Sequence, residues 1–180
     1  MSRDEARLIQ RAKEGDPAAF AEIYDQQQPA IYRYIFYRVG DVATAEDLTS
    51  EVFVRLVEKV DRFTYRGRPL LAWLYTIARN LVTDYRRRAG QAAMLPLDGQ
   101  LVAEGGNMEQ AAERGLAQRR LAAALTHLTE DQRQVIILKF IEGLNNAEVA
   151  QMLGKSAGAV KSLQHRALAA LRRILERNGG

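Results

Sequence analysis

Arginine and aromatic residues are interleaved along one stretch of the chain, residues 62–88. Arginine side chains bind phosphates and exposed aromatic rings stack on unpaired bases, so this combination is typical of single-stranded nucleic-acid binding. Asn80 could read the edge of an extruded base, because its amide group both donates and accepts hydrogen bonds. Core packing is the alternative for Phe63, and the favoured one for Trp73. The candidate ligands of a single strand are Phe63, Tyr65, Arg66, Trp73, Arg79, Asn80, Asp84, Arg87 and Arg88.

A second nucleic-acid pattern lies in the last third of the chain. Asn145 and Ser156 are residue types that cap helix N-termini, and Gly154 is suited to end the helix between them. The spacing predicts a helix-turn-helix, whose second helix reads the major groove with its N-terminal residues. A generic helical hairpin is the alternative. The candidate duplex-binding residues are Ser156, Ala157, Gly158, Lys161, Ser162, His165 and Arg166.

Helices must position both groups of residues. The alternation with period two that marks strands is missing, while capping signals are frequent, so we expect an all-α fold. The expected helices span residues 3–14, 17–27, 29–39, 44–60, 69–88, 109–126, 130–142, 146–153 and 157–177.

Apolar periodicity predicts which helix faces are buried. In the helix at 44–60 the apolar stripe runs from Leu48 to Val60 and includes Val57. The helix starting at Pro69 has its expected seam at Leu70, Leu74, Ile77, Leu81 and Tyr85. In the last third, the expected core residues are Leu125, Leu128, Val135, Ile136, Leu138, Phe140, Val160, Ala167, Leu168 and Leu171.

The predicted organisation is two small helical domains, 1–89 and 113–180, joined by a flexible linker at 90–112 that is rich in glycine. Charge is distributed unevenly. Residues 116–180 hold ten Lys and Arg against five Asp and Glu, whereas residues 91–115 hold one against four. A basic end is an electrostatic footprint for phosphate backbones, although charge alone fits a solvated helix face as well.

Composition excludes several classes of protein. The sequence has no cysteine and only two histidines, so disulfides, iron–sulfur clusters and thiolate zinc sites are ruled out and no cofactor or metal is expected. Without a catalytic constellation or a glycine-rich phosphate loop, we do not expect an enzyme. The chain lacks a run of about 18 apolar residues and a signal-peptide core, so we expect no membrane insertion and a cytoplasmic location.

Three motifs of the N-terminal half resemble the promoter-melting module of bacterial RNA polymerase sigma factors. They are residues 45–56 (AEDLTSEVFVRL), 73–80 (WLYTIARN) and 84–88 (DYRRR). The motifs at 128–136 (LTEDQRQVI), 160–162 (VKS) and 165–167 (HRA) are similar to the module of the same family that reads the −35 element. The absence of further domains points to the compact extracytoplasmic-function (ECF) group. That group often has Arg-Leu where this chain has Leu163-Gln164.

The resemblance implies a function and partners. The chain would bind core RNA polymerase, through the β′ clamp coiled coil and the β flap, and promoter DNA, and an anti-sigma factor would control it. Asp47, Ser50 and Glu51 would contact the clamp coiled coil, although acidic residues in a first helical turn are also simple capping. The −10 element would be melted by the first module, where Phe63, Tyr65, Arg66 and Asn80 match the region that captures a flipped base.

Two other classes of protein remain open from the residues alone. An autonomous helix-turn-helix regulator would use its N-terminal half for sensing or dimerisation, and it would bind duplex DNA tightly without a partner. An interaction protein, such as an anti-sigma factor or an adaptor, would leave both basic helices without a role.

Overall fold

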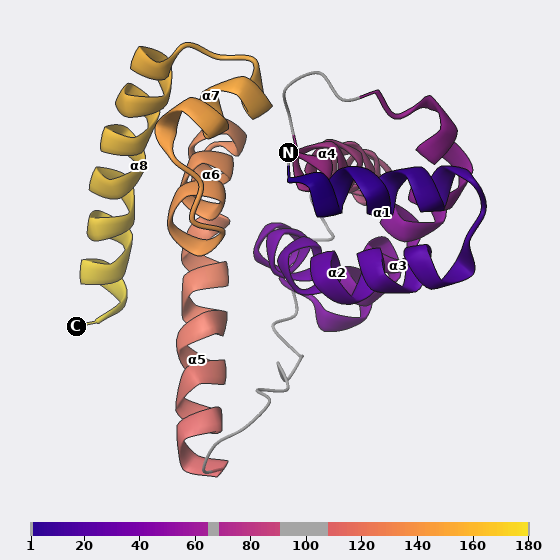
Figure 1. Cartoon of the computed structure of the whole chain (residues 1–180). Helices are drawn as coiled ribbons and strands as arrows, with labels where there is room; N and C mark the ends of the chain where they lie inside the picture. Colours follow the sequence, from indigo (N-terminus) through magenta and orange to yellow (C-terminus); the bar gives the residue numbers. More distant parts are fainter. Residues whose placement is uncertain (1, 65–68, 91–107, 180) are drawn as a thin grey trace. The chain divides into compact units, whose positions relative to one another are not determined.

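The computed structural model describes residues 2–64, 69–90 and 108–179. Every regular element within these ranges is helical, which confirms the predicted all-α class (Figure 1). The described residues within Met1–Ile35 and Ala45–Ala93 form one compact unit, and those within Phe36–Thr44 and Met94–Gly180 form a second. Residues 36–44 group with the second unit, although the predicted first domain included them.

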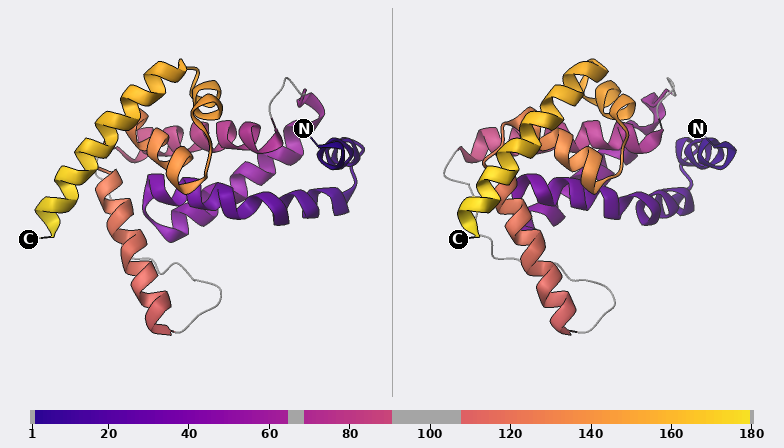
Figure 2. Two further views of the ribbon diagram at one scale, coloured as in Figure 1. Left: turned by 60° about the vertical axis from the view of Figure 1, so that its left-hand side comes forward. Right: turned by 90° about the vertical axis from the view of Figure 1, so that its left-hand side faces the viewer.

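The first unit contains α1 (Arg3–Lys13), most of α2 (Pro17–Val39) and of α3 (Val42–Lys59), the short η1 (Val60–Arg62), and α4 (Leu70–Ala89). Figure 2 shows α1 almost end-on near the start of α2, so α1 crosses α2 instead of running along it. Each helix contributes apolar side chains to one core. Buried members of this core are Leu8, Ile9, Ile23, Ile31, Val52, Phe53, Leu56, Leu70, Leu74, Ala78 and Val82.

The predicted break between helices at residue 28 is wrong, because α2 continues through Pro29. Proline inside a helix removes a hydrogen bond and crowds the preceding turn, which is why the sequence indicated two helices. Here Ile23 lies on one side of Pro29 and Ile31 on the other, and both are fully buried. Packing on both sides of the proline outweighs the local cost, as tertiary context often does.

The second unit contains α5 (Met108–Leu125), α6 (Glu130–Ile136), the π-helical η3 (Ile137–Ile141), α7 (Asn146–Leu153) and α8 (Ala157–Asn178). Residues 108–112 lie in α5, although the predicted linker included them. Helix α8 packs against α5, α6 and α7, and Figure 1 shows the short turn that joins α7 to α8. The predicted helix-turn-helix is therefore confirmed.

The predicted core of the second unit is largely confirmed, with two errors. Phe140 is 52% exposed, because the helix widens into a π turn from residue 137 and the side chains that follow no longer keep the α-helical phase. Leu168 is 42% exposed, and Leu163 is buried instead. Within the described residues, no helix is both long and apolar enough to span a membrane.

Candidate nucleic-acid interface

Helix α4 is held at its N-terminus by α1. The backbone N–H of Leu70 donates a hydrogen bond of 2.9 Å to a carboxylate oxygen of Glu5. The first N–H groups of a helix have no partner within the helix, and a negative charge there is favoured by the helix dipole. Residues brought together from distant parts of the sequence thus fix the start of the helix that carries most of the candidate single-strand ligands.

The exposed side of α4 carries the predicted polar residues. Trp73, Asn80, Asp84 and Arg87 follow at intervals of seven, four and three residues, so helical geometry places them on one face. Arg88 adjoins this face and is exposed like Asn80, Asp84 and Arg87, whereas Trp73 and Arg79 are half-buried. The positions of Tyr65 and Arg66 lie outside the described residues.

The buried side of α4 is rotated from the predicted seam. Tyr75, Ala78 and Val82 are buried with Leu70 and Leu74, whereas Ile77, Leu81 and Tyr85 are half-buried. Tyr75, Ala78 and Val82 therefore occupy the buried positions that the apolar pattern gave to Ile77, Leu81 and Tyr85.

Phe63 is packed into the first unit. Its side chain is 8% exposed, and its ring centroid lies 5.0 Å from that of Trp73, with the ring planes tilted by 42°. Aromatic rings at this separation stabilise each other. A buried ring cannot stack on a base, so in this structure Phe63 follows the core-packing alternative and supports Trp73 from within.

The outer face of α3 carries the three predicted polymerase-binding residues. Asp47 and Ser50 are exposed, and the half-buried Glu51 forms an ion pair of 3.1 Å with Arg55. The opposite side of α3, which includes Val52 and Leu56, is buried in the core. The three residues therefore lie on the side of α3 that faces away from the core.

Two valines extend this face of α3 and were missed from the sequence. Val54 is 48% exposed and Val57 is 54% exposed. Val57 was predicted as core, but it lies about 100° around the helix from Leu56, just beyond Phe53 at the edge of the buried stripe. Val54 follows Ser50 by four residues, and Val57 follows Val54 by three, which places them on the face of Ser50. This spacing was the available signal, and the apolar residue type concealed it.

Helix α8 begins with the expected cap. The Ser156 hydroxyl accepts a hydrogen bond of 3.1 Å from the N–H of Ala159, and Gly154 ends α7 in the left-handed conformation with φ of 66°. Val160, Leu163, Ala167 and Leu171 face the core. The predicted duplex-binding residues are all exposed, namely Ser156, Ala157, Gly158, Lys161, Ser162, His165 and Arg166.

A buried arginine fixes α6 beneath this motif. Arg133 Nε donates to the carbonyl oxygen of Leu125 at 2.8 Å, and its Nη2 atom donates to those of Leu128 and Thr126 at 3.1 and 3.2 Å. Burial, followed by repulsion from Arg38, lowers the pKa of Arg133 to about 10. The side chain still carries its charge at neutral pH, so it links the end of α5 and the following turn to α6.

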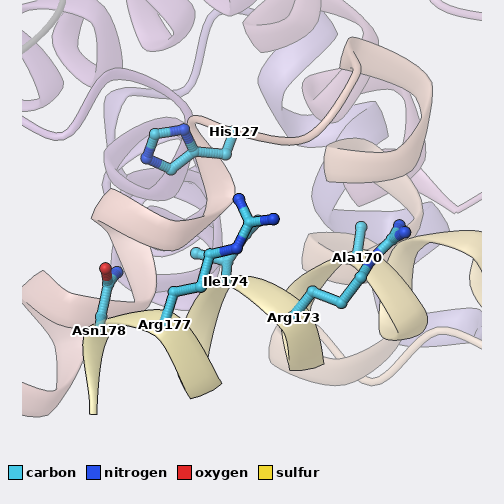
Figure 3. Close-up of a pocket in the computed structure, with 6 residues that line it drawn as sticks. All are labelled: His127, Ala170, Arg173, Ile174, Arg177 and Asn178. Carbon is cyan, nitrogen blue, oxygen red and sulfur yellow. The ribbon is translucent and has the colours of Figure 1, made fainter. Parts of the chain in front are cut away.

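A cavity of about 470 Å³ lies beside the C-terminal half of α8 (Figure 3). In Figure 3 the Arg177 guanidinium points to the side where His127 lies, whereas Arg173 points away from it. The lining residues are His127, Ala170, Arg173, Ile174, Arg177 and Asn178. This basic hollow includes none of the predicted duplex-binding residues, which lie at the other end of the helix.

The two units match known families and proteins. Residues 23–92 match Sigma-70 region 2, and residues 118–171 match Sigma-70, region 4. The chain is 41% identical to the ECF RNA polymerase sigma factor BldN of Streptomyces coelicolor, over 93% of this chain and 64% of BldN. It is 33% identical to the ECF RNA polymerase sigma factor SigW of Bacillus subtilis, over 94% of this chain and 95% of SigW.

A solved structure agrees with the sequence relatives. The sigma factor RpoE, in complex with the anti-sigma factor NepR from Bartonella quintana, superposes with a TM-score of 0.67 at 26% identity, covering 87% of this chain and 96% of RpoE. The match to region 2 includes α3 and α4, and the match to region 4 includes the N-terminal part of α8, so both matches cover the exposed faces described above. The chain belongs to the ECF sigma factors of RNA polymerase.

Proposed function

We propose that this sigma factor binds core RNA polymerase through the outer face of α3, opens the −10 element with α4 and reads the −35 element with α8. The observation that carries the proposal is the presence of these faces on two separate compact units, each matching the corresponding sigma region. The proposal assigns no bond chemistry to this chain, because polymerisation belongs to the partner.

The face of α3 suits a protein partner. Asp47 and Glu51 provide negative charge, and the exposed Val54 and Val57 provide apolar surface beside them. Protein interfaces combine an apolar centre with polar groups that fix register. A partner surface with basic and apolar side chains would fit this face, and the proposed partner is the β′ clamp coiled coil. The second unit would contact the β flap.

The face of α4 suits a melted strand. Arg87 and Arg88 would hold phosphates, and Asn80 would read a base edge about two turns earlier. Extruding a base costs a few kcal/mol, so a preformed site selective for that base supports both melting and specificity. Trp73, held by Phe63, offers an aromatic surface in the described part of this region.

The N-terminal turns of α8 suit the major groove. Lys161, His165 and Arg166 project from the side opposite the core, as a recognition helix requires. Tethering the two units makes the second contact intramolecular, which raises the joint affinity for a promoter without new surface. An anti-sigma factor is a further proposed partner, supported by the RpoE–NepR complex. A cytoplasmic location follows from the proposed partners.

Run-off transcription with purified core polymerase on a library of random promoters tests the proposal. We expect promoter-specific transcripts that depend on the added chain. Lys161→Ala and Arg166→Ala should each weaken use of −35-dependent promoters, by about 1–3 kcal/mol for a base contact, whereas loss of a phosphate contact lowers the salt slope by about one. Asn80→Ala should impair open-complex formation, seen by permanganate footprinting, more than polymerase binding. An autonomous regulator would instead bind specific duplexes tightly without polymerase.

A further inference from the structure

Three helical segments of the second unit meet at the Lys139 ammonium group. Lys139, in η3, donates hydrogen bonds of 2.6 Å to the side-chain oxygen of Asn146 and 2.5 Å to that of Gln164. Asn146 is the first residue of α7, and Gln164 lies in α8. All three side chains are half-buried. The positive charge of Lys139 therefore joins η3 to both helices of the helix-turn-helix.

Gln164 is placed where it can control the duplex-binding residues. It precedes His165 and follows Lys161 by three residues, so it lies within the same turns of α8. Its neighbour Leu163 is buried and faces the core. The side of the helix at Gln164 thus contacts the rest of the unit through a polar group, with an acceptor aimed at Lys139.

Hydrogen bonds fix a helix differently from apolar contacts. Apolar packing is non-directional and tolerates small rotations, whereas charge-assisted hydrogen bonds to a lysine require defined positions of donor and acceptor. The π turn at Ile137–Ile141 sets where Lys139 leaves its helix. A change in this cluster would rotate or shift α8, and displacement of about 1 Å is enough to misplace groups that read base edges.

We propose that Lys139 and Gln164 are positioning residues for −35 recognition, which hold α8 at the angle that its DNA-facing residues need. This inference rests on the proposed function of α8. It does not place Lys139 or Gln164 on the DNA.

The test uses the full chain with core polymerase and four variants. Gln164→Leu keeps the size of the side chain and removes the acceptor, and Lys139→Met removes the donor. Gln164→Glu keeps an acceptor for the lysine. Glu176→Gln is the control, since it breaks the exposed Arg172–Glu176 ion pair of 3.1 Å on the same helix. The measured quantity is the ratio of affinities for two promoters that share a −10 element and differ only in whether the −35 element is intact.

Gln164→Leu and Lys139→Met should each lower this ratio by about tenfold or more, as expected for a charged hydrogen bond that is lost. The double variant should lose no more than Lys139→Met alone, because that change already breaks the bond to Gln164 together with the bond to Asn146. Gln164→Glu and Glu176→Gln should keep the wild-type ratio. Each variant's melting temperature is measured beside it, since a purely structural role would lower the melting temperature without changing the ratio.

An unchanged ratio in Gln164→Leu overturns the inference, and so do additive losses in the double variant. Wild-type holoenzyme that shows no preference for the intact −35 element would instead contradict the proposed function of α8. A wild-type preference that survives in Gln164→Leu and Lys139→Met contradicts only the positioning role.

Discussion

The rings of Phe63 and Trp73 lie 5.0 Å apart, tilted by 42°. Phe63 is buried and Trp73 is half-buried, so one ring supports the other at the edge of the candidate single-strand site. The two aromatic residues, grouped together on sequence grounds, therefore differ in exposure, and only Trp73 of this pair is accessible enough to meet a base.

Substitutions of Phe63 separate support from direct stacking. Phe63→Leu should retain open-complex formation because leucine fills much of the same space, whereas Phe63→Ala should lower the free energy of unfolding by about 3–5 kcal/mol and impair melting with it. Thermal unfolding and permanganate footprinting of the two variants provide the measurements. If both variants lose promoter opening equally while Phe63→Leu keeps its thermal stability, the ring contacts DNA.

The exposed valines of α3 should contribute to polymerase binding. Val57→Asp places a charge in an apolar part of the proposed interface, and we expect at least a tenfold weaker affinity for core polymerase, with little change in melting temperature because Val57 is 54% exposed. Lys59→Ala is the matched control, since Lys59 is exposed on another side of the same helix. The affinities of both variants are measured by competition with the wild-type chain for fluorescently labelled core enzyme. Similar affinities for the two variants would place the interface elsewhere.

Capping residues made the second unit predictable from sequence. Asn145 and Ser156 cap α7 and α8 as expected, and Gly154 ends α7 in the left-handed conformation that glycine favours. These signals are local, so they survive without knowledge of the tertiary structure. The exposed faces of α3 and α8 were predictable for a related reason, because helical periodicity places polar residues opposite the core.

Features set by distant packing were not predictable. The continuity of α2 through Pro29 depends on burial of Ile31, and the exposure of Phe140 depends on a π turn that leaves no mark in the apolar pattern. The Arg133 hydrogen bonds and the contact of Glu5 with Leu70 join segments through backbone atoms. Backbone acceptors and donors carry no residue type, so the sequence does not reveal such pairings.

Gly158 offers a test in which stability and DNA binding should change in opposite directions. A Cβ at Gly158 would meet no atom within 4 Å, so the fold leaves room for alanine in this first turn of α8. Gly158→Ala should raise the free energy of unfolding by up to about 1 kcal/mol, because alanine favours helix. If the backbone here approaches DNA closely, −35-dependent binding should weaken. Tighter or unchanged binding would show that the first turn stays clear of the groove.

The corner between α1 and α2 should give a small dependence of stability on pH. The Arg11 guanidinium, 2.9 Å from Asp16, lowers the pKa of that carboxyl, aided by the backbone N–H of Ala18. Because the pKa of Asp16 is lower in the folded than in the unfolded state, its ionised form stabilises the protein at pH values above the unfolded-state pKa. This stabilisation is lost as the pH falls through the folded-state pKa. The melting temperature of the wild type should therefore exceed that of Asp16→Asn at pH 7, and this difference should close below about pH 4. A gap that persists at pH 2 would contradict this assignment.

Association with core RNA polymerase tests the central claim most directly. The purified chain is titrated into fluorescently labelled core enzyme, and transcription is measured in the same samples on promoters recovered from the random library. We expect saturable binding that Glu51→Ala and Val57→Asp weaken, together with promoter-specific transcripts that appear only when the chain is present. A chain that binds no core enzyme, or binds it without directing any specific transcript, would contradict the account.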